Sequence, residues 1–506
     1  MTFTVKSVGL KGIDGYFVTV EADCLKGIPS FDIVGMAGQA VKEATRRVRS
    51  AYSNAVGDFQ KGRITVNLAP ADTEKEASAL DLPIFIAVCG AFGLLENVLQ
   101  DTVFIGELSL SGELREVGGV LAYTAFAAEN GIKRIVLPKC CAKEASLIPG
   151  IEVIGITDVK ELISYLKGEI TVLPQESSLD NAYENEGLPD FAEVRGHYFA
   201  KRALEIAAAG GHNIALIGPP GSGKSMLAKR LPSIMPPLDR EEVVEVTKIW
   251  SVAGRTQGKL IQAPPFRSPH HTVSPVGLSG GGSIPRPGEI SLAHHGVLFL
   301  DEWPEFSKTS LEILRQPIED KQITISRAAQ SSTFPADFIL VTAANPCKCG
   351  NFGSERKCSC SPRERKMYMS HISGPLLDRM DLMIEVPPVP LSDLENKMAE
   401  EPSSSILKRV LSARERQKER LAPYGIKLNS QMTHDMITRL CVLTDSAKAL
   451  VTKAFDFYGL TARSYDRLLR TAQTVADLEG KDEIDELIIA EVISYRTAEK
   501  KYFFRG

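Results

Sequence analysis

Residues 218–225, GPPGSGKS, have the composition and spacing of a loop that binds nucleotide phosphates. They follow the apolar run 213–217 and precede a segment, 226–235, with the character of a helix. Glycines let backbone N–H groups turn toward phosphate oxygens at the helix start, where the helix dipole favours anions. Lys224 would reach the β- and γ-phosphates, and the Ser225 hydroxyl would ligate Mg²⁺. The predicted nucleotide-binding residues here are Gly218, Pro219, Pro220, Gly221, Ser222, Gly223, Lys224, Ser225 and Met226.

Two carboxylates follow a second apolar run, in the stretch GVLFLDE at 296–302. Asp301 can share Mg²⁺ with Ser225, and Glu302 can polarise a water for in-line attack on the γ-phosphate. An apolar strand that ends in Asp-Glu also occurs in purely structural settings. The phosphate loop before it and the further apolar run 338–344 behind it favour the catalytic interpretation.

Asn345 ends that further run, FILVTAAN. A polar side chain at the end of a central strand can orient the attacking water. The alternative is that Asn345 only caps a turn before Pro346. The two preceding motifs make the catalytic role the preferred hypothesis.

Four cysteines form two Cys-x-Cys pairs in the stretch NPCKCGNFGSERKCSC, within a loop expected to span 345–362. Two such pairs can place four thiolates around a structural Zn²⁺. The loop is rich in Gly, Ser and charge, so a metal would supply order that burial cannot. Reduced free cysteines and a redox-sensing disulfide are the alternatives. The predicted zinc ligands are Cys347, Cys349, Cys358 and Cys360.

The elements that must position these residues fall into three parts. Residues 1–168 alternate strands and helices, and 169–189 are polar and acidic, as in a linker. Strands and helices then alternate through 190–390, and 391–506 are almost wholly helical in pattern. The prediction is therefore a multidomain α/β protein with a helical C-terminal domain.

Composition narrows the functional classes. The 506 residues carry a net charge of −4, so any nucleic-acid surface must be local rather than a property of the whole chain. The apolar run 82–95 is too short to cross a membrane, so no membrane association is expected. The nine cysteines are not spaced like a disulfide framework, which indicates a reducing, cytoplasmic location.

The order of these motifs, a Walker A loop, a Walker B strand with Asp-Glu and then Asn on the next strand, resembles AAA+ ATPases. More narrowly, the chain resembles magnesium-chelatase-like AAA+ ATPases of the ComM/YifB type. The matching stretches cover nearly the whole chain and include FRSPHHTVSPVGLSGGG, PRPGEISLAHHGVLFLDEWPEF, ISGPLLDRMDL and GLTARSYDRLLRTAQTVADLEG. The resemblance implies ATP and Mg²⁺ as cofactors, and a C-terminal lid of the magnesium-chelatase type.

The resemblance also implies roles for residues outside the motifs. Arg379 would be an arginine finger that reaches the γ-phosphate of a neighbouring subunit, and Arg463 the lid arginine known as sensor 2. Sequence alone does not separate Arg463 from Arg467 or Arg470. Val194 would lie near the adenine. A finger that works in trans requires a ring, so the family implies a homo-hexamer.

The N-terminal part resembles the protease domain of Lon, which has the fold of ribosomal S5 domain 2. Lon activates a serine with a lysine. Here Leu121 stands where the lysine is expected, and Asp81 lies near the place of the serine. Ser78 is close by without an evident base. We therefore expect a Lon-like α+β fold without peptidase chemistry.

Two insertions are candidates for contact with nucleic acid. Residues 267–286 contain RSPHH and a Gly-rich turn, and 321–338 are predicted to form a hairpin. The resemblance implies that such insertions point into the pore of a ring. Lys321 and Arg327 could contact the phosphates of a threaded strand, although a structural hairpin with solvated charges is the alternative. A metal role is not expected for the adjacent pairs His270–His271 and His294–His295. Adjacent side chains usually diverge, and no carboxylate is suitably spaced in sequence.

The expected function is that of an ATP-hydrolysing ring motor on single-stranded or branched DNA. The resemblance implies a helicase that promotes branch migration when incoming DNA recombines in natural transformation. One alternative is a magnesium-chelatase-type motor that remodels a protein partner for metal insertion. The other, a Lon-like ATP-dependent protease, is disfavoured by Leu121.

Overall fold

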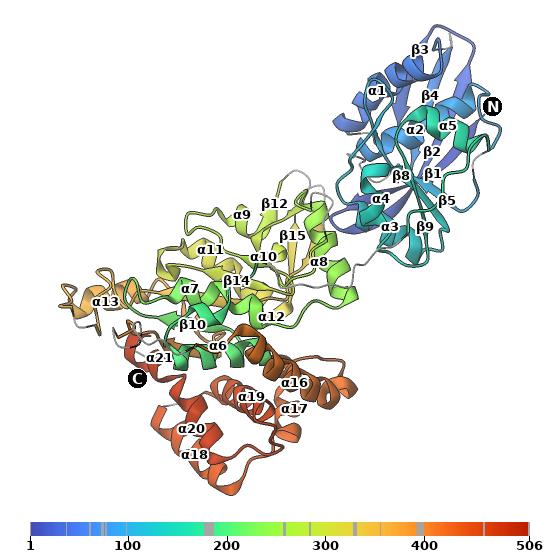
Figure 1. Cartoon of the computed structure of the whole chain (residues 1–506). Helices are drawn as coiled ribbons and strands as arrows, with labels where there is room; N and C mark the ends of the chain where they lie inside the picture. The colour runs from blue at the N-terminus through green and yellow to red at the C-terminus, as the bar shows by residue number, and fades with distance from the viewer. Residues whose placement is uncertain are drawn as a thin grey trace.

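The computed structural model has a mixed α/β N-terminal domain, an ATPase-like α/β domain and a C-terminal helical domain (Figure 1). The linker that joins the first two is described only at its ends. The structure describes residues 2–36, 38–59, 62–71, 75, 78–97, 99–176, 187–256, 260–282, 285–326, 331–354, 356–390, 393, 399–458 and 461–503.

The N-terminal domain is built on two sheets. The larger has the strand order β1-β2-β4-β3, with β3 parallel to β4 and the other pairs antiparallel. Its strands are β1 (Phe3–Lys11), β2 (Asp14–Leu25), β3 (Ser30–Val34) and β4 (Arg63–Ala69). Helices α1 (Gln39–Ala55) and α2 (Asp81–Ala91) pack on it. The apolar run 82–95 is therefore mainly a buried helix, because α2 takes up most of it.

The second N-terminal sheet is parallel, in the order β5-β8-β9. Its strands are β5 (Thr102–Phe104), β8 (Arg134–Pro138) and β9 (Glu152–Ile156). The short antiparallel pair β6 (Glu107–Leu108) and β7 (Leu114–Arg115) lies between β5 and the next helix in the chain. The helices of this half are α3 (Val120–Glu129), α4 (Lys139–Ala145) and α5 (Val159–Leu166).

The ATPase domain contains a five-stranded parallel sheet in the order β11-β14-β17-β10-β18. Both of its faces are covered, so its strands are apolar throughout rather than alternating with polar residues. On β10, for example, Leu216 packs with the helical domain and Ile217 with the opposite face. The strands are β10 (Ile214–Ile217), β11 (Phe266–Arg267), β14 (Val297–Leu300), β17 (Ile339–Ala344) and β18 (Leu382–Glu385).

Helices and two small antiparallel pairs surround this sheet. The pair β15 (Gln322–Ser326) and β16 (Ser331–Pro335) forms the expected hairpin, and β12 (Gly280–Gly281) pairs with β13 (Arg286–Pro287). The helices are α6 (Tyr198–Gly210), α7 (Lys224–Lys229), α8 (Arg240–Val252), α9 (Pro275–Ser279), α10 (Glu289–Leu292), α11 (Lys308–Ile313), α12 (Arg315–Asp320), α13 (Pro362–Met369) and α14 (Gly374–Leu377).

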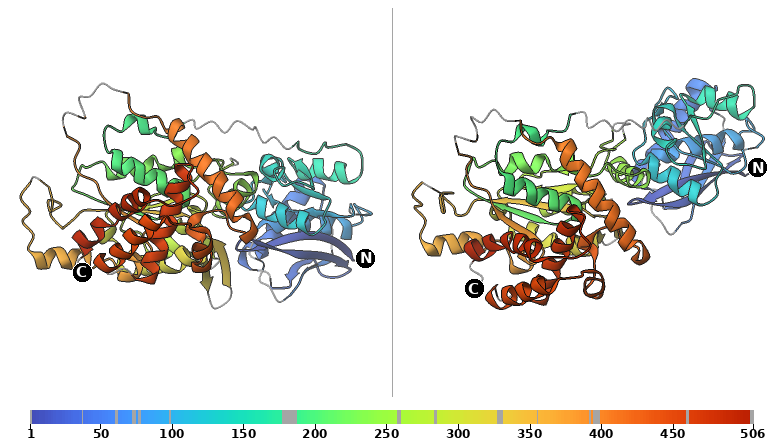
Figure 2. Two further views of the ribbon diagram at one scale, coloured as in Figure 1. Left: turned by 90° about the horizontal axis from the view of Figure 1, so that it is seen from below. Right: turned by 60° about the horizontal axis from the view of Figure 1, so that its bottom comes forward.

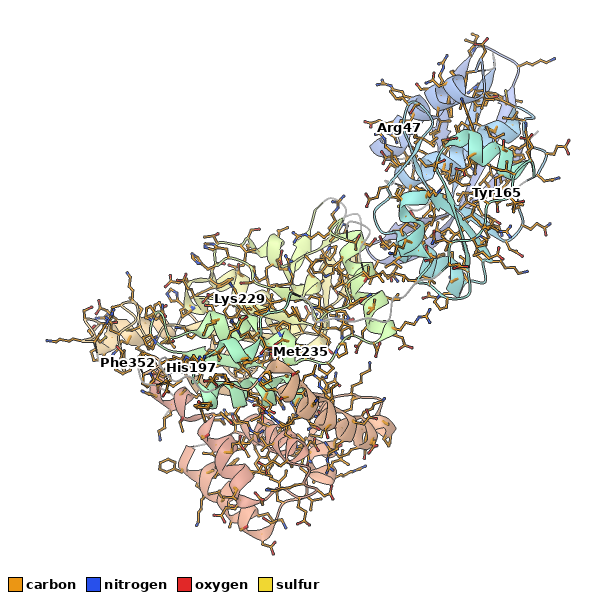
Figure 3. All side chains as sticks on the ribbon, viewed as in Figure 1. Arg47, Tyr165, His197, Lys229, Met235 and Phe352 are labelled. Carbon is orange, nitrogen blue, oxygen red and sulfur yellow. The ribbon has the colours of Figure 1, made fainter. Side chains whose placement is uncertain are left out.

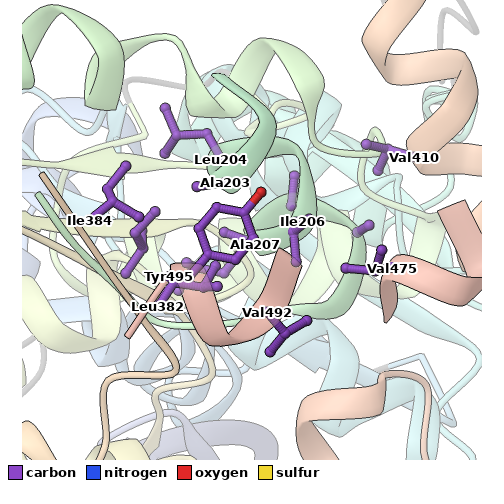
Figure 4. Packing of buried hydrophobic residues seen from close by; sticks show 14 of the residues in the cluster. Ala203, Leu204, Ile206, Ala207, Leu382, Ile384, Val410, Val475, Val492 and Tyr495 are labelled. Carbon is purple, nitrogen blue, oxygen red and sulfur yellow. The ribbon is translucent and has the colours of Figure 1, made fainter. Parts of the chain in front are cut away.

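The helical domain shares one apolar core with the ATPase domain. Figure 4 shows Tyr495 and Val492 against Ala203, Ala207 and the strand that carries Leu382. The helices of this domain are α16 (Ser403–Leu421), α17 (His434–Leu440), α18 (Asp445–Tyr458), α19 (Ala462–Leu478) and α20 (Glu486–Ser494). The last helix, α21 (Thr497–Phe503), returns to the ATPase domain and packs beside β18.

The N-terminal domain lies to one side of the ATPase domain in both views of Figure 2. Helix α3 packs against α8, where the Gly119 N–H donates to Ser251 Oγ at 3.0 Å. Ile13, in the turn between β1 and β2, joins the apolar cluster that contains Phe334 of the hairpin. In the part of the chain that the structure describes, no helix combines the length and the hydrophobicity needed to span a bilayer.

Candidate nucleotide site

The phosphate loop joins β10 to α7, as the sequence predicts for a strand–loop–helix motif. Gly221 and Gly223 have φ of +77° and +83°, a backbone conformation that favours glycine. A Cβ on Gly218 would lie 2.1 Å from the Val386 carbonyl oxygen, so a side chain has no room there. The buried Ser222 hydroxyl has no hydrogen-bond partner among the described residues, which leaves a polar group for an anion in the loop.

Lys224 lies in the curve of this loop. Its ammonium donates to the carbonyl oxygens of Gly218 at 2.7 Å and Pro219 at 2.9 Å, and to Asn345 Oδ1 at 3.3 Å. Burial lowers the pKa of Lys224 to about 8, and the Asp301 carboxylate opposes that shift. The loop therefore holds a cation whose charge is stabilised mainly by neutral oxygens, which fits a polyphosphate ligand.

The two residues predicted to hold Mg²⁺ are in contact. Ser225 Oγ donates to Asp301 Oδ2 at 2.6 Å, although 76 residues separate them in sequence. A hydroxyl beside a carboxylate at the end of a buried strand is a donor set that suits Mg²⁺. The residues present thus fit both ATP and the metal ion.

Sheet order explains why Asn345 reaches the same place. Strand β17 lies between β10 and β14, so its carboxyl end lies between the phosphate loop and Asp301. The carboxyl ends of parallel strands meet at one edge, where ligands bind in open α/β sheets. Asn345 therefore contacts Lys224, and its role as a water-orienting residue stays a prediction.

Glu302 has a partner that the sequence did not reveal. Its backbone has φ +53°, and its carboxylate Oε2 lies 3.2 Å from His271 Nδ1. Its side chain is 54% exposed, as a base that must receive water needs to be. His271 belongs to the RSPHH stretch, so an insertion considered for DNA contact touches the predicted catalytic base.

Val194 is fully buried, and its carbonyl accepts a hydrogen bond from Lys201 Nζ at 2.6 Å. The nearby His197 is closer to the phosphate loop, since a Cβ on Gly223 would lie 3.3 Å from His197 Nε2. Figure 3 shows His197 on the same side of the ATPase domain as Lys229 of α7. Met226 flanks the loop from α7, with its methyl group beside Gly223.

Arg379, whose side chain is only 10% exposed, and the exposed Arg463 lie together in a different part of the structure. Both approach Glu319 Oε1, Arg379 Nη2 at 2.5 Å and Arg463 Nη2 at 3.9 Å. They line a cavity of about 490 Å³ with Arg467 and Arg470. The described residues that line this cavity include none from the phosphate loop. The assignment of Arg379 as a finger that acts on a neighbouring subunit stays a prediction.

Two of the three arginines of α19, Arg463 and Arg467, differ in their surroundings. Arg467 is buried and donates to the carbonyl oxygens of Met380 at 2.6 Å and Leu377 at 3.3 Å. Burial lowers the pKa of Arg467 to about 10. It therefore ties the helical domain to the segment that carries Arg379, whereas the Arg463 side chain is 67% exposed. Exposure favours Arg463 over Arg467 as the arginine that meets a ligand.

The four cysteines of the predicted zinc loop converge. Cys347 Sγ lies 3.4 Å from Cys349 Sγ and 3.7 Å from Cys358 Sγ, and Cys349 and Cys358 are 3.6 Å apart. Together with Cys360, all four sulfurs lie within 4.8 Å of one another. A tetrahedral Zn²⁺ with bonds of about 2.3 Å places sulfurs about 3.8 Å apart, so the cluster has the size of a zinc site.

The surroundings of the cysteines shift the pKa values of their thiols in opposite directions. Burial raises the pKa of the Cys347 thiol to about 12, whereas backbone N–H donors from Asn351 and Ser359 lower that of Cys349 to about 5. All nine cysteines of the chain are free, so the disulfide alternative has no support in this conformation.

The His294–His295 pair corrects one sequence interpretation. The two rings do not diverge: their centroids are 3.9 Å apart, and both Nε2 atoms face Glu245 Oε2, at 3.4 and 3.2 Å. His295 has φ +54°, which turns the two side chains to one side. The carboxylate belongs to Glu245 of helix α8, which lies far from the pair in sequence and close to it in the fold.

Glu245, His294 and His295 lie close enough together to hold a metal ion, but one hydrogen bond argues against His294 as a ligand. His294 Nδ1 accepts the Asp337 backbone N–H at 2.9 Å, so the proton of the neutral ring is on Nε2. That nitrogen then has no lone pair for a metal. The two histidines face the Glu245 carboxylate and lower its pKa. We interpret the three side chains as a polar contact within the fold.

In the N-terminal domain, the residues around the expected peptidase position are occupied by structural contacts. Arg47 binds Asp81 through two hydrogen bonds of 2.6 and 2.9 Å, and the Leu108 N–H also donates to Asp81. The Ser78 hydroxyl donates to Glu107, a carboxylate on β6. Leu121 is fully buried. These contacts favour a structural role for this region.

The hairpin β15–β16 gives less support to DNA contact than expected. Lys321 lies at its base and forms an ion pair with Asp337 at 3.0 Å, so it is not at the tip, where a threaded strand would pass. Arg327 lies outside the described residues. The basic residues of this hairpin therefore do not by themselves establish a nucleic-acid surface.

Comparisons with known families agree with this geometry. Residues 190–394 match the family described as "Magnesium chelatase, subunit ChlI". Residues 20–140 match "Subunit ChlI of Mg-chelatase", and 400–496 match its C-terminal family. These families imply an AAA+ ATPase with ATP and Mg²⁺ as cofactors.

Curated relatives extend over nearly the full length. Competence protein ComM of Haemophilus influenzae is 40% identical over 494 residues, which cover 96% of this chain and 95% of the relative. YifB of Escherichia coli is 39% identical over 492 residues, covering 97% and 96%. DNA replication licensing factor mcm7 of Schizosaccharomyces pombe is 23% identical over 234 residues, or 44% of this chain and 27% of the relative. With the nucleotide site assembled as described, the chain belongs to the ComM/YifB family of magnesium-chelatase-like AAA+ ATPases.

Proposed function

We propose that this protein is an ATP-driven motor that assembles as a hexameric ring and moves DNA. In this proposal Lys224 holds the phosphates, Glu302 activates water, Asn345 orients it, and Ser225 and Asp301 hold Mg²⁺. The bound Mg²⁺ would neutralise charge on the β- and γ-phosphates.

The main support for this proposal is that two sets of predicted catalytic residues lie apart from each other within one subunit. Lys224, Ser225 and Asp301 are assembled within one subunit, whereas Arg379 and Arg463 meet elsewhere, at Glu319. A head-to-tail ring would bring the second set of one subunit to the first set of the next. The relatives named for competence and for DNA replication support DNA as the substrate, and branch migration during natural transformation is the process we infer.

Mixing two inactive variants tests the ring. Lys224→Ala and Arg379→Ala should each abolish ATPase activity. A mixture should recover part of it, because some interfaces then combine an intact phosphate loop with an intact finger. No recovery would mean that Arg379 acts within its own subunit or not at all, and the ring mechanism would be wrong.

The DNA substrate has its own test. Steady-state ATPase rates are measured with single-stranded, duplex and four-way-junction DNA, and branch migration is followed on the junction. Stimulation that is lost in Lys224→Ala supports the motor. ATPase activity indifferent to every DNA would favour the second candidate, a magnesium-chelatase-type motor on a protein partner, which the family descriptions support.

We also propose that the loop 345–362 binds one Zn²⁺ through Cys347, Cys349, Cys358 and Cys360. The spacing of the sulfurs and the few apolar residues in the loop support it. Metal analysis of protein purified without chelator should give about one zinc per chain. A content near zero would remove the proposal without affecting the ATPase.

A further inference from the structure

We infer that the four-cysteine loop positions the catalytic groups of the ATPase, so that zinc occupancy controls the hydrolysis step. The inference rests on the zinc site proposed above. Its basis is that both ends of the loop, and one turn within it, contact the nucleotide site. Zinc would then hold catalytic residues in place without touching the nucleotide.

The first contact is through the chain itself. Asn345 at the end of β17 lies two residues before Cys347, which is fully buried. Gly218 at the start of the phosphate loop donates its N–H to the Ala344 carbonyl at 3.1 Å. An anchored Cys347 therefore limits how far Asn345 can move from the Lys224 ammonium.

The second contact is between the cysteine loop and the phosphate loop. The Gly350 N–H donates to the Cys347 carbonyl at 2.9 Å, which closes a tight turn. A Cβ on Gly350 would lie 2.5 Å from Pro220 Cδ, so this turn lies directly against the phosphate loop. Gly350 has φ +78°, which also favours glycine there.

The third contact lies on the other side of the cysteines. Ser361 follows Cys360 directly and caps α13. Just beyond this helix, His371 Nδ1 lies 3.1 Å from the Pro304 carbonyl, in the turn that follows Glu302. On α13 itself, the Glu305 and Glu302 carboxylates add to burial in raising the pKa of Tyr368. The helix that follows the cysteines is thus packed against the segment with the catalytic base.

Contacts outside the metal site keep the loop in the fold. The Arg365 guanidinium lies 3.9 Å above the Phe352 ring, and Phe352 packs edge-on against Tyr502 of α21. Figure 3 shows Phe352 at the end of the ATPase domain remote from the N-terminal domain. Loss of zinc should therefore loosen the loop locally and leave the rest of the fold intact.

The test compares Cys358→Ser with the matched control Cys441→Ser, a buried cysteine outside the cluster. DNA-free ATPase kinetics, Mg-ATP affinity by fluorescent nucleotide, zinc content and circular dichroism are measured for each. We expect Cys358→Ser to lose zinc and to lower kcat by about 100-fold, because small displacements of catalytic groups have that effect. The Mg-ATP Kd should change much less, since Asn345 and the Glu302 segment serve hydrolysis rather than binding.

Wild-type protein stripped of zinc by chelator should show the same loss, and added Zn²⁺ should restore kcat. A zinc-free protein with unchanged kcat would overturn the inference. Wild-type protein that never contains zinc would overturn the metal site itself. Because no DNA is present, neither result depends on whether DNA is the substrate.

A second variant keeps all four cysteines. Gly350→Ala should retain zinc and still reduce activity, because the added methyl would displace Pro220. Gly480→Ala is its control, since Gly480 has a similar φ of +69° and open space within 4 Å of the position that the added methyl would take. Equal effects of the two substitutions would mean that backbone strain, rather than contact with the phosphate loop, matters.

Discussion

Lys224 should make ATP binding depend on pH in a range where few other groups titrate. Burial lowers the pKa of its ammonium to about 8 in the free protein. Bound phosphates would favour the charged form and raise that pKa again. Binding therefore takes up a proton wherever the free lysine is partly neutral, and affinity falls as pH rises through 8.

The magnitude follows from the fraction of charged lysine. With a pKa of about 8, roughly nine-tenths of Lys224 is charged at pH 7 and about one-tenth at pH 9. The Kd for Mg-ATP should therefore increase about tenfold between these values, or about 1.4 kcal/mol. At pH 8, about half a proton should be taken up for each ATP bound.

Isothermal titration calorimetry in buffers of different ionisation enthalpy measures both quantities. Lys224→Arg is the control, because an arginine stays charged across this pH range. The Kd of this variant for Mg-ATP should therefore not vary with pH. A wild-type Kd that is flat from pH 7 to 9, or a variant with the same pH profile as the wild type, would refute the reasoning.

Three further changes test individual contacts. Glu302→Gln should still bind ATP but hydrolyse it about 10²–10⁴-fold more slowly, since it removes the base; a rate near wild type would exclude that role. His271→Ala removes the ring nitrogen that lies 3.2 Å from the Glu302 carboxylate, a partly exposed contact worth up to about 1 kcal/mol, and should raise the DNA-free ATPase rate by up to about fivefold, with His270→Ala as control; a slower rate would contradict this. Arg420→Ala leaves the buried Asp477 without its two-pronged partner, at 2.6 and 2.7 Å, and should lower the free energy of unfolding by about 3 kcal/mol in urea titrations; a loss below about 1 kcal/mol would show that the remaining partners suffice.

The mixed α/β architecture was largely predictable because its elements have clear local signals. The apolar runs that became β10, β14 and β17 are short, lack charged residues and end in functional side chains. The hairpin β15–β16 also follows from alternating residues. The strand order of the five-stranded sheet was not predictable, since each of its strands pairs with others that lie far from it in sequence.

By itself, the sequence determined the residues that act within one contiguous motif. The spacing of Lys224 and Ser225 fixes both side chains at the start of one helix, and the Cys-x-Cys pairs fix which sulfurs can meet. These arrangements depend on only a few backbone angles, so residue type and spacing specify them.

The tertiary structure alone decided the contacts between distant segments. It joins His271 to Glu302, places Glu319 between Arg379 and Arg463, and packs the Gly350 turn on the phosphate loop. None of these pairs has a local signal, because each depends on how strands and helices pack rather than on neighbouring residues. The same holds for His294 and His295, whose convergence on a carboxylate required a left-handed backbone and a separate helix.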